Sequence, residues 1–187
     1  NKAASLSFDA AVQSCTKKRN EIFADKAEIF TGCERENAAI NAITMCNLQL
    51  LIDDGRFLRP CQGGSSERFH VWVWEAMESL RPMLRLGFYD AVKGALEFIF
   101  TLQDSIYAPD GNFSSLEGCI GNSALRWACS TGAALVLAVE YIHYSGDRDF
   151  LAKYLPQMLA AGRWIINEIR ATRIPGSPYY GVMPECR

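Results

Sequence analysis

Residues 145–149 read Ser145-Gly146-Asp147-Arg148-Asp149, and they separate two long segments whose apolar residues recur at helical spacing. Residues 86–90, Leu86-Gly87-Phe88-Tyr89-Asp90, occupy the same place between the two preceding segments. The two glycines lie 59 positions apart, and a glycine at such a point ends one helix before the next begins. A helical hairpin that recurs at this interval predicts an α-solenoid or a closed α/α toroid.

The apolar pattern predicts a chain that is all-α. One segment, 123–144, is apolar nearly all round, which is typical of an inner helix that packs on several sides. We expect Asp147 to be the N-cap of the last helix, and Pro156 to start the main run of that helix. No region is rich in strand signals, and residues 71–74 are too short an extended stretch to imply a sheet. The predicted helices cover residues 6–30 (a weaker pattern), 35–52, 75–86, 89–103, 123–144 and 149–171.

Composition narrows the classes of function. The net charge is −2 and no basic stripe runs along the 187 residues, so a nucleic-acid partner is not expected. Charged residues or glycine break every long apolar stretch, so no membrane span is expected. The seven cysteines form no C-x-x-C pair and are accompanied by two histidines, which argues against a metal site. Nucleotide-binding loops and dinucleotide fingerprints are absent, and no cofactor is expected.

Loop lengths predict where the function lies. The turns at Gly87 and Gly146 are short, whereas the segments 55–74, 105–122 and 173–187 are long. Short turns join antiparallel neighbours at one end of the helices, so the long segments must meet at the other end, where functional residues usually lie. That end gathers Trp72, Trp74, Glu75, Asp110, Glu117, Asn122, Arg126, Trp127, Tyr179, Tyr180 and Glu185.

Aromatic rings beside carboxylates are typical of a site that binds sugars. Indole and phenol rings stack on the apolar faces of sugars, and carboxylate, amide and guanidinium groups bind the hydroxyls. Glycoside hydrolysis needs a carboxylic acid that protonates the leaving oxygen, with a second carboxylate across the bond. We expect Glu75 to be this acid; the alternative is that the tryptophans fill the core and Glu75 only begins a helix. The candidate substrate-binding residues are His70, Trp72, Trp74, Asn122, Arg126 and Trp127.

Residues 34–187 resemble the six-hairpin glycosidases, whose catalytic domain is an α/α toroid. The resemblance rests on the order and spacing of short motifs: residues 69–75, 86–91, 102–103 with 109–111, 126–127 with 131–132, 145–147 with 150–151, and 181–184.

The resemblance implies a glycoside hydrolase in which Trp74-Glu75 opens an inner helix and supplies the general acid or a principal sugar ligand. It also implies that 34–187 form the first half, about three hairpins, of an (α/α)6 toroid, preceded by an N-terminal helical segment at 1–33. The remaining half of the toroid, from the same full-length chain, would be the partner of this half. It would carry the second carboxylate, so this piece is expected to be inactive alone.

Two other functions remain open at this stage. A helical-repeat interaction domain would need no catalysis, and it would not need tryptophans clustered at one end. A toroid lyase or epimerase acting on saccharides would use Tyr or His near an acidic sugar, and Tyr179, Tyr180, His70 and Arg126 are available for this chemistry.

Overall fold

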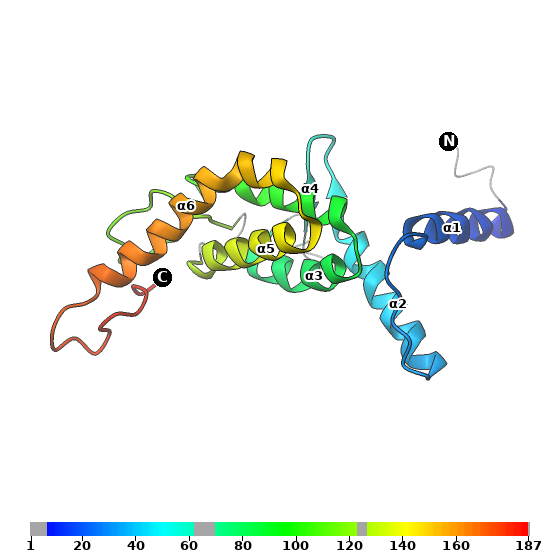
Figure 1. Cartoon of the computed structure of the whole chain (residues 1–187), viewed down its shortest axis with the longest axis horizontal. Helices are drawn as coiled ribbons and strands as arrows, with labels where there is room; N and C mark the ends of the chain where they lie inside the picture. The colour runs from blue at the N-terminus through cyan, green and yellow to red at the C-terminus, as the bar shows by residue number, and fades with distance from the viewer. Residues whose placement is uncertain (1–6, 62–69, 123–126, 187) are drawn as a thin grey trace.

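The computed structural model describes residues 7–61, 70–122 and 127–186. Within these residues the chain forms six helices and one two-stranded sheet, so the prediction of a mostly helical chain is confirmed. Figure 1 shows an elongated molecule in which α3 to α6 pack together while α1 and α2 extend to one side.

The N-terminal helices contribute little to the core. Helix α1 (Phe8–Phe23) begins at Ser7, whose hydroxyl accepts a hydrogen bond from the amide of Ala10, and it has no buried residue. The ring of Phe23 contacts the ring of Phe88 at 5.4 Å, which holds the end of α1 against the α3–α4 turn. The observed helix ends at Phe23, seven residues before the end of the helix predicted for residues 6–30. Helix α2 (Glu34–Gln49) buries one side chain.

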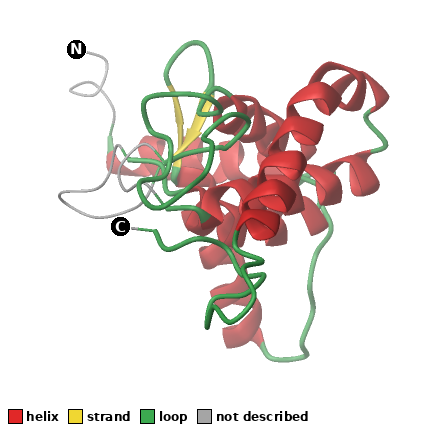
Figure 2. Cartoon of the chain, turned by 90° about the vertical axis from the view of Figure 1, so that its left-hand side faces the viewer, coloured by secondary structure: helices red, strands yellow, loops and turns green. Residues whose placement is uncertain are grey.

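A short β-hairpin follows α2, and the sequence pattern did not predict it. Strands β1 (Leu51–Asp53) and β2 (Leu58–Pro60) pair antiparallel, and Figure 2 shows them in yellow. The hairpin packs on α4 (Tyr89–Phe100), where Leu58 lies so close to Gly94 that a Cβ there would stand 2.9 Å from its Cδ1 atom. Residues 50–52 thus leave the helix predicted for 35–52, because pairing with β2 satisfies their backbone.

Two helical hairpins form the centre of the fold. Helices α3 (Val73–Arg85) and α4 are joined at Gly87, and helices α5 (Cys129–Ser145) and α6 (Arg148–Ala171) are joined at Gly146. Both glycines adopt positive φ angles, and the Asp147 carboxylate accepts a hydrogen bond from the amide of Phe150, as predicted for an N-cap. Pro156 lies inside α6 and does not start it, so that expectation was wrong.

The two hairpins pack against each other in two layers (Figure 1). Helix α3 packs on α5, and α5 also contacts α4. Aromatic side chains join α4 to α6. Phe100 of α4 stacks on Tyr154 of α6 at 4.8 Å, and Phe150 contacts both rings. Small residues of α5, among them Ala134 and Ala138, are fully buried and let α3 approach closely. Burial of this aliphatic and aromatic core is the main source of stability.

The long connections lie at the end opposite the short turns. Figure 1 shows the segments 101–122 and 172–186 at that end, together with the first residues of α3 and α5. Hydrogen bonds join these parts: the amide of Val73 donates to the side chain of Asn122, and the amide of Asn112 donates to the carbonyl of Glu185. The predicted long segment 55–74 is different, because β2 and the hairpin turn occupy its first part.

Candidate functional site

Asn122 organises the start of α3. Its Oδ1 atom accepts hydrogen bonds from the amide of Val73 and from the hydroxyl of Ser130, each at 2.8 Å. The residue is 1% exposed, and it takes the capping role that Trp72, at the N-cap position, does not perform. One buried amide therefore fixes the loop before α5, the first turn of α5 and the first turn of α3 at one place.

Trp72 and Trp127 meet beside this amide. Their ring centroids are 5.3 Å apart and the rings are inclined at 69°, an edge-to-face pair. Glu75 lies one turn after Trp72 on the same side of α3. Trp127 remains 37% exposed, so the pair is accessible from the surface. Of the predicted site residues, these three and Asn122 are brought together.

Among the residues that the structure describes, three buried polar atoms at this place have no hydrogen-bond partner: Nε1 of Trp72, Oε2 of Glu75 and Nδ2 of Asn122. Exchanging the oxygen and nitrogen of the Asn122 amide would place its NH2 group against the Val73 amide, which is also a donor, so the orientation is fixed by chemistry. Buried polar atoms are normally paired, because an unpaired one loses its bonds to water without compensation. The cluster therefore offers two donors and one acceptor to a ligand or to water.

Cys129, the first residue of α5, borders the same cluster. Partial burial of its thiol raises the pKa, although the residue as a whole is exposed, and the nearby carboxylate of Glu75 and thiol of Cys186 raise it further. The thiol is accordingly neutral near pH 7 and is not a nucleophile there. The shift also indicates that Glu75 and Cys186 both lie near Cys129.

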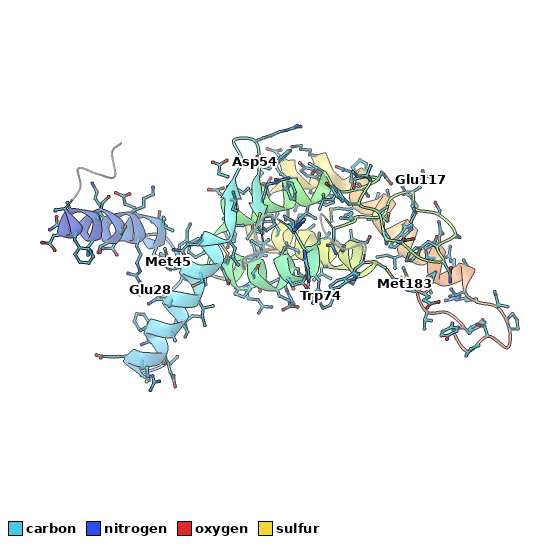
Figure 3. All side chains as sticks on the ribbon, turned by 180° about the vertical axis from the view of Figure 1, so that it is seen from behind. Glu28, Met45, Asp54, Trp74, Glu117 and Met183 are labelled. Atoms are coloured by element: carbon cyan, nitrogen blue, oxygen red, sulfur yellow. The ribbon has the colours of Figure 1, made fainter. Side chains whose placement is uncertain are left out.

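Trp74 and His70, two further candidate residues, do not join the Trp72–Trp127 pair in the same way. Val71 and Val73 are fully buried, so the alternation holds before the helix, and His70 is half-buried. The helix begins at Val73, however, and its 100° step turns Trp74 away from Trp72. Trp74 is 45% exposed (labelled on α3 in Figure 3), and none of the ring contacts among the described residues joins it to another tryptophan. Arg126, the remaining candidate, lies outside the described residues.

Glu168 of α6 holds the loop that carries Asn122. The carboxylate is fully buried and accepts hydrogen bonds from the amide of Ser114 at 2.7 Å, from its hydroxyl at 2.6 Å, and from the amide of Ser115 at 3.0 Å. Trp164, one turn earlier, donates from its indole nitrogen to the carbonyl of Ser115 at 2.7 Å. We did not single out Glu168 from the sequence. Its place on the same apolar stripe as Phe150 and Trp164 was the available signal.

Among the described residues, no group of three or more His, Cys, Asp or Glu side chains is arranged to hold a metal ion. In the same part of the chain, no helix combines the length and the apolar character needed to cross a membrane. Comparison with known protein families, with curated proteins and with solved structures found no match to this chain.

Proposed function

We propose that the chain is part of a glycoside hydrolase and that the cluster around Trp72, Glu75, Asn122 and Trp127 is its sugar-binding site. The observation that carries this proposal is the set of three polar atoms without a partner among the described residues, beside a pair of indole rings of which Trp127 is exposed. A pyranose ring needs both features, because its C–H face binds an aromatic surface while its hydroxyls need donors and acceptors.

Each polar group has a role in this proposal. The indole nitrogen of Trp72 and the amide nitrogen of Asn122 donate to sugar oxygens, and both are held in place by the packing of α3 against the 120–122 loop. Glu75, when protonated, donates its proton to the glycosidic oxygen as the bond breaks. The second carboxylate either activates the attacking water as a general base or attacks the anomeric carbon itself, and we assign it to the other half of the domain.

We further propose that α3/α4 and α5/α6 are consecutive hairpins of an (α/α)6 toroid, with α3 and α5 in the inner layer. The two-layer packing and the short turns at one end support this arrangement. Helices α5 and α6 also expose apolar side chains that a following hairpin would cover. These side chains are Val136, Val139, Leu155, Leu159 and Ile166.

The test is hydrolysis of a panel of aryl glycosides and oligosaccharides by the full-length protein. Glu75→Gln keeps the shape of the side chain but cannot donate a carboxylic proton, so kcat should fall by roughly 10²–10⁴-fold while substrate still binds. Glu78→Gln is the matched control, because Glu78 is exposed on the same helix and outside the cluster. Trp127→Ala should weaken substrate binding, because it removes the exposed ring of the indole pair.

Melting curves must show that each variant is folded. A folded Glu75→Gln protein that retains near-normal turnover on a substrate of the wild type would remove Glu75 from the mechanism. The proton donor would then have to be sought at Asp110 or Glu117, or in the second half of the domain.

A further inference from the structure

A second hollow lies near the C-terminal end of α6. Its volume is about 660 Å³, and it is enclosed by the end of α6, the loop at 112–114 and the segment 172–185. The lining is mixed: Ser177, Tyr179 and Glu185 are polar, whereas Ile174 and Met183 are apolar. Small-molecule sites in proteins have this size and this mixture of surfaces.

Hydrogen bonds hold the walls of the hollow in place. The amide of Asn112 donates to the carbonyl of Glu185 at 3.0 Å, and the hydroxyl of Thr172 donates to the carbonyl of Val182 at 2.6 Å. Ser114, on the opposite wall, is bound to the buried carboxylate of Glu168. Gly111 lets the loop lie directly against the segment that carries Glu185, because a Cβ there would stand 2.9 Å from the Cα of Cys186. A ligand would therefore enter a site that is already formed, with little ordering cost.

The hollow borders the Trp72–Glu75 cluster. Glu185 lines it, and the next residue, Cys186, lies near Cys129, which in turn lies near Glu75. Figure 1 shows the segment 172–186, which forms one wall of the hollow, at the same end of the molecule as the first residues of α3 and α5. A chain of linked units could thus reach from one place to the other.

We propose that this hollow is a second carbohydrate subsite, which takes a neutral sugar unit of an oligosaccharide whose neighbouring unit occupies the Trp72–Glu75 cluster. The proposal rests on the proposed function. Tyr179 supplies a ring that is 70% exposed at the rim. The hydroxyl of Ser177 is suited to bind a sugar hydroxyl, and that of Thr172, whose proton goes to the chain's own carbonyl groups, can accept from one. Glu185 is the one charged residue among the described residues of the lining, and its carboxylate disfavours an acidic sugar.

The test is calorimetric titration of the full-length protein with cello-, malto-, xylo- and mannohexaose and with the matching disaccharides. For the series that binds, Tyr179→Ala should weaken hexasaccharide binding by roughly threefold to tenfold, the scale of one aromatic contact. The same variant should leave disaccharide binding unchanged, because a disaccharide fills only the Trp72–Glu75 cluster. Tyr180→Ala is the matched control, since Tyr180 is also exposed but does not line the hollow.

The outcomes separate this inference from the proposed function. Hexasaccharide binding that Trp127→Ala weakens and Tyr179→Ala leaves intact would overturn the second subsite and leave the proposed function standing. Equal losses for disaccharide and hexasaccharide in Tyr179→Ala would make the hollow the primary site and overturn its role as an extension. If none of the sugars bound the folded wild type, both proposals would fall.

Discussion

Arg81 of α3 and Glu140 of α5 form a bidentate ion pair, in which the arginine Nε donates to Oε2 at 2.9 Å and Nη2 donates to Oε1 at 2.6 Å. The arginine lowers the pKa of the glutamate, and the fork geometry makes the pair stronger than most surface pairs. We expect Glu140→Gln to lower Tm by roughly 2 °C. Glu21→Gln is the control, because Glu21 pairs with Lys17 at 4.0 Å on an exposed face of α1 and should leave Tm unchanged. Equal changes in Tm for the two variants would show that the bidentate pair stabilises the protein no more than an exposed surface pair does.

Asp147 links the α5–α6 turn to α4, and its charge makes stability depend on pH. The Lys93 ammonium, the Phe150 amide and the Tyr141 hydroxyl all donate to its carboxylate, and together they hold the pKa of Asp147 well below its ordinary value of 3.8. The stabilisation is therefore fully present above the ordinary pKa and is lost as the pH falls toward the folded-state pKa.

Asp147→Asn isolates this charge, because the amide oxygen can still accept from Phe150 and cap α6. We expect Tm at pH 6 to fall by roughly 2–4 °C relative to the wild type, and the difference to shrink at pH 3. Calorimetry at the two pH values checks this. A difference that stays constant with pH would mean that the carboxylate acts through packing and not through its charge.

The turns and caps of the two hairpins could be predicted because local chemistry determines them. Gly87 and Gly146 have positive φ, and Asp147 caps the helix that follows it, all within a few residues of sequence. The β-hairpin could not be recognised in the same way. Leu51 and Ile52 continue the apolar run of α2, and only pairing with residues 58–60 makes them a strand.

The candidate site was predictable in part, for a similar reason. The loop lengths predicted that Trp72, Glu75 and Trp127 lie at one end of the helices, and the structure places Trp72 against Trp127. Trp74 does not join this pair, because α3 begins at Val73, two residues before the predicted start at residue 75, and the helical turn changes the direction of the Trp74 side chain. The capping role of Asn122 spans 49 positions of sequence and depends wholly on tertiary packing.

Gly121 lies where two segments of the loop at 101–122 pass close to each other. A Cβ at this position would stand 1.8 Å from the carbonyl oxygen of Tyr107, whereas a Cβ at Gly132 of α5 would meet nothing within 4 Å. Gly121→Ala should therefore cost about 1–3 kcal/mol, because the loop must shift. Gly132→Ala should stabilise the protein by up to about 1 kcal/mol, since alanine favours a helix interior. Urea unfolding measures the free energy of unfolding of both variants. If Gly121→Ala left that free energy unchanged, the two loop segments would have room for a methyl group.

Asn122→Ala tests whether one buried amide joins the site together. The substitution leaves the Val73 amide and the Ser130 hydroxyl without their acceptor in a place that water does not reach easily. The cost should be about 1–3 kcal/mol, the penalty for an unpaired buried group. Ser130→Ala removes one donor and leaves no backbone group unpaired, so it should cost about 0.5–1.5 kcal/mol.

The difference between these two variants should also appear at the tryptophans. Loss of the Asn122 cap loosens the first turn of α3, which holds Trp72 against Trp127, so Asn122→Ala should change the near-UV circular dichroism of the indoles. Ser130→Ala leaves the Val73–Asn122 bond in place and should retain the wild-type spectrum. If both variants kept that spectrum and unfolded at the same urea concentration, Asn122 would be an ordinary core residue, and the indole pair would owe its geometry to packing alone.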